Sequence, residues 1–234
     1  QALSLLETPG TITVRERYQE AGIPTSAITA EAWVRIDQPL RWGGIVGAIQ
    51  DNGDYERGWI LGYVDDRFSF AVASEKEPIV LTYLTATTTF EKGRWYHVVG
   101  TYDGKVMKIY VDGEQRGESS VQEGLISYPP KTSLNIGGYR DENENYPMQG
   151  MLHEIRIYGK ALDASVIKEH ASSRILHSPL LATLPFGPYL QFLDSGSAII
   201  RWELKDGVDS VVVLKDGPGR RTFASVAVDG MQEV

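Results

Sequence analysis

The sequence predicts an all-β fold, an antiparallel jelly-roll β-sandwich with one short helix at its C-terminal end. Three observations support this prediction. Strand-like runs separated by turn residues recur through the first 160 residues, no long amphipathic helical pattern interrupts them, and Asp-Gly pairs end two neighbouring runs. Many short strands with regular turns are typical of antiparallel sandwiches rather than of parallel α/β sheets.

The clearest element is a hairpin near the middle of the chain. Residues 95–102 have the period-two pattern of a strand, so that successive side chains point to opposite faces. Asp103-Gly104 then favours a tight turn, because both residue types tolerate a positive φ. The next strand, residues 106–111, should therefore return antiparallel beside the first, and a second Asp-Gly pair follows it.

The remaining elements are predicted from the same signals. Strands are expected at residues 28–36, 44–50, 58–64, 67–73, 79–84, 133–136 and 151–157. One helix is expected at residues 164–171, where Asp163 is a good N-cap. Val166, Ile167 and His170 would share one face of that helix.

Five motifs, in one order along the chain, resemble the laminin-G-like, concanavalin-A-like jelly-roll domains. They are AEAWV at 30–34, GGIV at 43–46 with RGWILG at 57–62, WYHVVGTYDG at 95–104 with KIYVDG at 108–113, LNIGG at 134–138, and GMLHEIRIY at 150–158. The resemblance covers residues 1–173 and implies a jelly roll with a closing helix. Some domains of this family bind calcium at a loop rim, so the resemblance also makes calcium a candidate cofactor.

The character of the sequence changes after this domain. Residues 174–186 contain Ser-Pro and Pro signals and are interpreted as a linker. In residues 187–234, GPYLQF and SAIIRWEL resemble the start of the fibronectin-III-like domain that precedes the catalytic domain of purple-acid-phosphatase-type metallophosphoesterases, with Trp202 as its core tryptophan. An immunoglobulin-like sandwich takes about 100 residues, so we interpret this segment as incomplete; an intact small β unit is the alternative.

The composition limits the classes of partner. The net charge of −8 makes nucleic acid and anionic membranes poor partners, and no apolar run is long enough to span a bilayer. The chain has no cysteine, which leaves export open. It starts without an initiator Met, so we interpret it as an internal piece of a larger extracellular, periplasmic or cell-surface protein.

Two acidic clusters are candidate metal sites. Asp51, Asn52 and Asp54 surround a glycine, and Asp141 and Glu142 lie in a loop before the last strand. Carboxylate and amide oxygens suit calcium. If both clusters lie at one end of the sandwich they would build a single calcium site; a hairpin turn at Asn-Gly and a solvated acidic loop are the alternatives.

Aromatic and basic side chains are the candidate ligand contacts. Trp42 lies in a predicted loop, where an indole would stack on a sugar face or a peptide, with Arg41 and Arg57 as hydrogen-bond donors. Trp59 is a further candidate, although it belongs to a family motif and packing in the sheet is its alternative. His97 is predicted to be a hydrogen-bonded structural histidine, since no second metal ligand lies at suitable spacing.

Catalytic patterns are absent from the sequence. The alternating carboxylates of sandwich-fold glycosidases, a nucleophile elbow and a phosphate-binding Gly-rich loop do not occur. We therefore predict a non-catalytic recognition module for carbohydrate, glycoconjugate or a surface protein, attached to a catalytic domain that is a metallophosphoesterase. A glycoside hydrolase of the same fold and a purely structural packing module are the alternatives.

Overall fold

The computed structural model describes residues 3–5, 10–15 and 23–172, and the backbone of six strands between residues 186 and 233. The chain divides into two units, residues 2–174 and residues 175–234. Within the described residues, no helix is long and apolar enough to cross a membrane.

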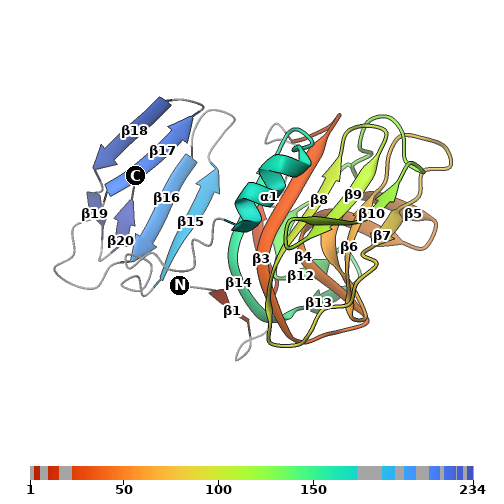
Figure 1. Ribbon diagram of the computed structural model, residues 1–234, viewed down its shortest axis with the longest axis horizontal. Coiled ribbons are helices and arrows are strands. Elements are labelled where there is room, and N and C mark those ends of the chain that lie inside the picture. The colour runs from red at the N-terminus through yellow and green to blue at the C-terminus, as the bar shows by residue number, and fades with distance from the viewer. Residues whose placement is uncertain are drawn as a thin grey trace. The chain divides into compact units, whose positions relative to one another are not determined.

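The first unit is built from two six-stranded antiparallel sheets, so the predicted jelly-roll sandwich is confirmed (Figure 1). The first sheet has the order β1 (Leu3–Ser4), β14 (Gln149–Tyr158), β3 (Ile28–Gln38), β8 (Trp95–Tyr102), β9 (Met107–Val111) and β10 (Glu114–Ser119). The second has the order β2 (Ile12–Arg15), β11 (Leu134–Ile136), β4 (Trp42–Asn52), β5 (Tyr55–Val64), β6 (Arg67–Val72) and β7 (Thr82–Thr85).

The central hairpin forms as the sequence predicts, but its two turns differ. β8 and β9 are joined by a loop in which Asp103 Oδ1 accepts hydrogen bonds from the N–H groups of Lys105 (2.9 Å) and Val106 (2.7 Å). The β9–β10 turn is tighter, because Asp112 and Gly113 both have positive φ angles, of 52° and 79°. That pair of angles is the one a two-residue hairpin turn requires.

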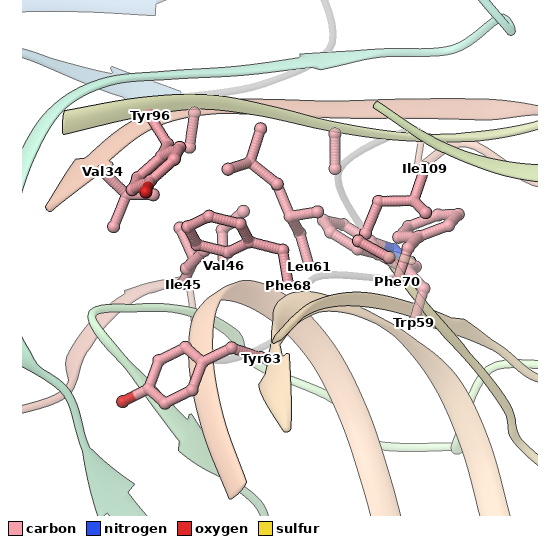
Figure 2. Close-up of a cluster of buried hydrophobic side chains, with 14 of the residues drawn as sticks. Val34, Ile45, Val46, Trp59, Leu61, Tyr63, Phe68, Phe70, Tyr96 and Ile109 are labelled. Carbon is pink, nitrogen blue, oxygen red and sulfur yellow. The ribbon is translucent and has the colours of Figure 1, made fainter. Parts of the chain in front are cut away.

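The core lies between the sheets and contains the large aromatic side chains. Along β3 the inward residues alternate with outward ones, and the inward Ala30, Ala32 and Val34 are fully buried. Figure 2 shows Trp59, Leu61 and Phe70 from the second sheet pointing into the same layer. This burial supplies the main stabilising free energy of the unit.

A β-bulge interrupts β4 between Gly44 and Val46. As a result Ile45 and Val46, which are adjacent in the sequence, both belong to the buried core. Beyond the bulge, Ile49 packs in a second, smaller cluster on the outer face of the second sheet, with Ile60, Ala71, Ala73, Leu81 and Tyr139.

A short hairpin of β12 (Gly138–Arg140) and β13 (Asn145–Pro147) lies close to β4. A Cβ atom at Gly44 would lie 2.3 Å from the backbone oxygen of Gly138. A glycine at position 44 is therefore needed for this close approach.

The outer face of the first sheet carries helix α1 (Ala164–Ser172), as Figure 1 shows. Its only buried residue, Ile167, packs on Val99 and Tyr110. Beside this contact, the buried Glu31 accepts hydrogen bonds from His97 Nε2 (2.9 Å) and His170 Nδ1 (3.0 Å). The prediction that His97 is a hydrogen-bonded structural histidine is confirmed.

Arg156 completes this buried cluster. Its Nη1 atom donates to Glu31 at 3.1 Å, and its Nη2 atom donates to Glu154 at 2.7 Å. Burial alone would raise the pKa of Glu31, but the hydrogen bonds from His97 and His170 and the attraction of His97 and Arg156 outweigh it and lower the pKa.

The second unit consists of antiparallel strands. β15 (Phe186–Phe192), β16 (Ala198–Glu203), β20 (Met231–Glu233) and β19 (Val226–Val228) form one sheet, and β17 (Val211–Asp216) pairs with β18 (Gly219–Ala224). The side chain of Trp202 and residues 174–185 of the predicted linker lie outside the described residues, whereas Phe186, its last predicted residue, begins β15. The fibronectin-III-like assignment of this segment stays a prediction.

Candidate functional site

The candidate site lies on the outer face of the second sheet, where the two acidic clusters meet. Asp51 stands near the end of β4, and Asp141 follows β12, 90 positions later in the chain. The backbone N–H of Asp51 donates to Asp141 Oδ2 at 3.2 Å. The fold therefore brings together the two clusters that the sequence analysis could only treat separately.

Asp141 holds its own loop in place. Its Oδ1 atom accepts from the N–H groups of Asn143 (3.1 Å) and Glu144 (2.8 Å), and its Oδ2 atom accepts from the Tyr139 hydroxyl (2.9 Å) in addition to Asp51. A carboxylate has about four lone-pair positions. Those of Asp141 are occupied by donors from the protein itself, which gives this residue a structural role at the rim of the site.

Two tyrosine hydroxyls, from the half-buried Tyr83 and the buried Tyr139, donate to the acidic pair. Tyr83 donates to Asp51 Oδ2 at 2.9 Å, and Tyr139 donates to Asp141. Burial, followed by the negative charges of Asp51 and Asp141, raises the pKa of both tyrosines well above the usual value of 10.0. Both hydroxyls therefore stay protonated and act as fixed hydrogen-bond donors.

An exposed tryptophan extends the site along the sheet. Trp42 begins β4, is 41% exposed, and its ring lies 5.5 Å from that of Tyr83 at an angle of 59°. The guanidinium carbon of Arg41 lies 5.8 Å from the Trp42 ring. We define the aromatic face as Trp42, Tyr83 and Asp51, with Arg41 beside it.

Two predicted ligand contacts are positioned elsewhere. Trp59 is fully buried in the core, so the prediction that it contacts a ligand is wrong. The physical reason is its strand register, since the side chain of residue 59 points between the sheets (Figure 2). Arg57 is partly buried, stacks 4.6 Å from the Tyr55 ring and donates to the carbonyl oxygen of Glu56 at 2.8 Å, so its guanidinium is already engaged.

The predicted calcium ligands are assembled only in part. Asn52, with its amide nitrogen turned toward Asp141, donates to Asp141 Oδ2 at 3.1 Å, whereas Asp54 and Glu142 are exposed on turns. Among the residues described for this chain, no three acidic or histidine side chains are arranged to hold a metal ion. Because Asp141 is also saturated with donors, the set fits calcium poorly. Calcium binding stays a prediction, which a calcium titration followed by thermal denaturation would test.

A groove of about 220 Å³ lies next to the acidic pair. Asp141 and Glu142 contribute to its lining, together with Thr13, Ser133, Lys131 and Arg140. We call it the basic groove. Sequence reasoning missed Tyr83, Lys131 and Arg140, because the face of a strand that is exposed, and the loops that meet across a sheet, are set by tertiary structure.

We predict that Asp141→Ala destabilises the domain. The substitution leaves the Tyr139 hydroxyl and the loop N–H groups without their acceptor, which costs about 1–3 kcal/mol for a buried donor. Glu142→Ala removes an exposed carboxylate from the same loop and is expected to change stability by less than about 0.5 kcal/mol. Urea denaturation followed by tryptophan fluorescence measures both, and equal midpoints for the two variants would contradict the structural role of Asp141.

Comparisons with known proteins agree on the fold. The chain is similar to pappalysin-1 of mouse, with 25% identity over 169 residues, which are 68% of this chain and 10% of the relative. It is also 29% identical over 137 residues to human pappalysin-1, which covers 53% of this chain and 8% of the relative. The chain thus spans about a tenth of the length of these relatives or less.

Two solved structures share the architecture. A putative carbohydrate binding protein from Bacteroides ovatus is 19% identical, with a TM-score of 0.52 over 95% of this chain and 54% of that one. Domain 4 of AbnA, an extracellular arabinanase from Geobacillus stearothermophilus, solved with arabinotriose, is 16% identical, with a TM-score of 0.50 over 64% of this chain and 69% of that one. At this level of identity the likeness concerns the fold.

The family itself is shown by a match to a family model. The laminin-G model described as the Concanavalin A-like lectin/glucanases superfamily matches residues 11–168, which are more than half of the 234 residues. That span includes every strand of the two sheets except β1, the aromatic face and most of α1. The chain therefore belongs to the concanavalin A-like lectin/glucanases superfamily.

Proposed function

We propose that residues 2–174 form a non-catalytic carbohydrate-recognition module that binds a sugar on its aromatic face. The observation that carries the proposal is the position of Trp42, an exposed indole that lies against Tyr83 and thereby next to the Asp51 carboxylate. An exposed tryptophan beside fixed polar groups is the arrangement that a sugar ring requires, since its C–H face is apolar and its rim is polar.

The polar contacts of the proposed ligand follow from the hydrogen bonds that Asp51 and its neighbours already make. Asp51 accepts a bond from the Tyr83 hydroxyl at Oδ2, which leaves a carboxylate further capacity to accept from sugar hydroxyls. Arg41 is exposed and lies beside the indole, so its N–H groups are placed to donate to ring or hydroxyl oxygens. The aromatic face therefore offers stacking, an acceptor and a donor within one surface.

The structural neighbours support the same class of ligand. One of them is named as a putative carbohydrate binding protein, and another was solved in complex with arabinotriose. Both cover most of the sandwich described for this chain. We extend that class, carbohydrate, to the present module as part of the proposal.

The proposal includes a larger, exported parent protein. The relatives are far longer than this chain, which is what a module attached to other domains would show. Linking a recognition module to a catalytic domain raises the effective concentration of substrate without chemistry of its own. A metallophosphoesterase as that catalytic domain, and an extracellular, periplasmic or cell-surface location, remain parts of this proposal.

The central test is Trp42→Ala on a glycan array, followed by calorimetry with the best glycan. Loss of the stacking surface is expected to weaken binding by about tenfold or more. The cost to stability should not exceed about 1.5 kcal/mol, because the main packing partner of the indole is a single aromatic ring.

Val121→Ala provides the control, since it removes a 57% exposed apolar side chain outside the aromatic face. Glycan binding that survives Trp42→Ala unchanged would contradict the proposed site. Release of reducing sugar from the bound glycan by the wild-type chain would instead favour a glycoside hydrolase.

A further inference from the structure

The basic groove contains two cations that lack a carboxylate partner. In the described part of the chain, neither Lys131 nor Arg140 has an acidic oxygen within 4.0 Å. The one hydrogen bond from the Arg140 guanidinium goes to the hydroxyl oxygen of Thr13, at 3.2 Å. Both side chains are exposed, so their charges face the groove and solvent.

Among the side chains that the structure describes, most other arginines have a partner within the fold. Ion pairs join Arg35 to Asp37, Arg94 to Asp112, Arg116 to Glu114 and Arg156 to Glu154. Arg57 and Arg67 donate to backbone carbonyl oxygens. Lysines without an ion pair are common among the described residues, Lys92 and Lys105 being examples, so the distinguishing feature of Lys131 is that it lines one groove together with Arg140.

Polar side chains lie around these cations. Ser133 and Gln50 line the groove with them and can donate, whereas the Thr13 hydroxyl donates its proton to Asn135 Oδ1 at 2.9 Å. Lysine and arginine with neighbouring hydroxyls are donors for an oxyanion, and an arginine fork matches the geometry of a carboxylate. The groove therefore has the chemistry to bind a carboxylate.

The acidic residues of the groove do not cancel this preference. Asp141 has its two oxygens occupied by donors from Tyr139, Asp51 and its own loop. Glu142 is exposed and makes no ion pair with Arg140 or Lys131. The Glu142 carboxylate can accept hydrogen bonds from the hydroxyl groups of a sugar, which must be bound along with the carboxylate of that sugar.

The basic groove and the aromatic face are adjacent. Asp141 lines the groove, and the N–H of Asp51, whose carboxylate holds Tyr83, donates to Asp141. The groove volume of about 220 Å³ is below the range of about 300–1,000 Å³ that is common for drug-sized ligands. It therefore matches one sugar unit rather than a whole oligosaccharide.

We propose that the basic groove is a subsite for an acidic sugar, in which Lys131 and Arg140 bind the carboxylate of a uronate unit. The inference rests on the proposed function, because it assigns the class of glycan that the module recognises. One sugar of the chain would stack on the aromatic face, while its acidic neighbour occupies the groove.

The test pairs each acidic ligand with a neutral copy of itself. Calorimetry measures the affinity of the 234-residue chain for oligomers of galacturonate, glucuronate and mannuronate and for their methyl esters, which keep the sugar ring but lack the negative charge. We expect at least one acid form to bind about tenfold or more tightly than its ester, and the difference to shrink as salt increases.

Three variants locate the binding. Lys131→Gln and Arg140→Gln are each expected to remove most of the preference for the acid over the ester, whereas Lys105→Gln, an exposed cation in the β8–β9 turn, should leave it unchanged. Lys131 makes no ion pair with the described residues, so its variant keeps the test valid even if Arg140→Gln loosens the loop. Thermal denaturation checks the folding of each variant.

Each outcome decides between the two proposals. Equal affinity for acid and ester, or a preference for the acid that both groove variants retain, overturns the subsite. In that case, loss of glycan binding in Trp42→Ala still upholds the proposed function. A preference that depends on the groove but not on Trp42 upholds the subsite and overturns the aromatic face. If sulfated glycans bind through the groove and uronates fail to bind, the carboxylate assignment is overturned. The absence of binding to every uronate overturns it as well.

Discussion

Trp59→Ala is expected to lower the free energy of unfolding by about 3–5 kcal/mol, the cost of removing a large aromatic side chain from a packed core. Trp59 has no exposed surface and lies between the sheets with Leu61 and Phe70 (Figure 2). The remaining atoms cannot fill a space of that size, so the loss includes both burial and a cavity. Urea denaturation gives the change directly.

Trp42→Ala is the matched control for this result, because it removes the same side chain from an exposed position on the neighbouring strand. We expect opposite phenotypes: Trp59→Ala destabilises the domain, and Trp42→Ala impairs binding. If Trp59→Ala unfolds at the wild-type midpoint but fails to bind glycan, Trp59 is a ligand contact after all, and the described core is contradicted.

Glu31→Ala is the second variant with a large expected effect. Removing this carboxylate takes one hydrogen-bond partner from each of Arg156, His97 and His170, on a largely buried surface. Breaking a buried charge network by deleting one member costs about 3–5 kcal/mol. Because His170 belongs to α1, the helix should loosen first, and amide hydrogen exchange would show lost protection in Ala164–Ser172.

The same cluster predicts a dependence of stability on pH. The pKa of Glu31 is lower in the folded chain than its ordinary value of 4.5, so the unfolded state binds the proton more readily. Its contribution is therefore complete above about pH 4.5 and is lost as the pH falls through the lower, folded pKa. We expect wild type and Glu31→Gln to approach each other in stability over that range; a constant difference down to acid pH would contradict the ionised cluster.

A strand of this fold is predictable from the sequence when its two faces differ clearly in hydrophobicity. β8 and β9 combine clear alternation with turn residues and were predicted almost to the residue. β10, with the sequence EQRGES, has no apolar face and was missed, because it forms through pairing with β9 rather than through its own burial. β7 begins at Thr82 rather than near residue 79, since Ile79 packs in the loop over the outer face.

The candidate site was only partly predictable for a related reason. The sequence singles out Trp42, Asp51 and Asp141, because a tryptophan in a predicted loop and carboxylates in turns are not explained by packing in a hydrophobic core. Tyr83 could not, because alternation places it on one face of a strand without showing which face has a ligand beside it. The Glu31 cluster was also invisible, since its members come from four separate elements, β3, β8, β14 and α1.

The bulge in β4 determines which residues can share a surface. In a regular strand, positions 42 and 51 are separated by an odd number of steps and would point to opposite faces. The extra residue between Gly44 and Val46 reverses the alternation, so that both Trp42 and Asp51 reach Tyr83 on the outer face. The proposed binding surface thus depends on the length of the strand as well as on its composition: a one-residue deletion at the bulge would turn Trp42 and Asp51 to opposite faces without removing either residue from the sequence.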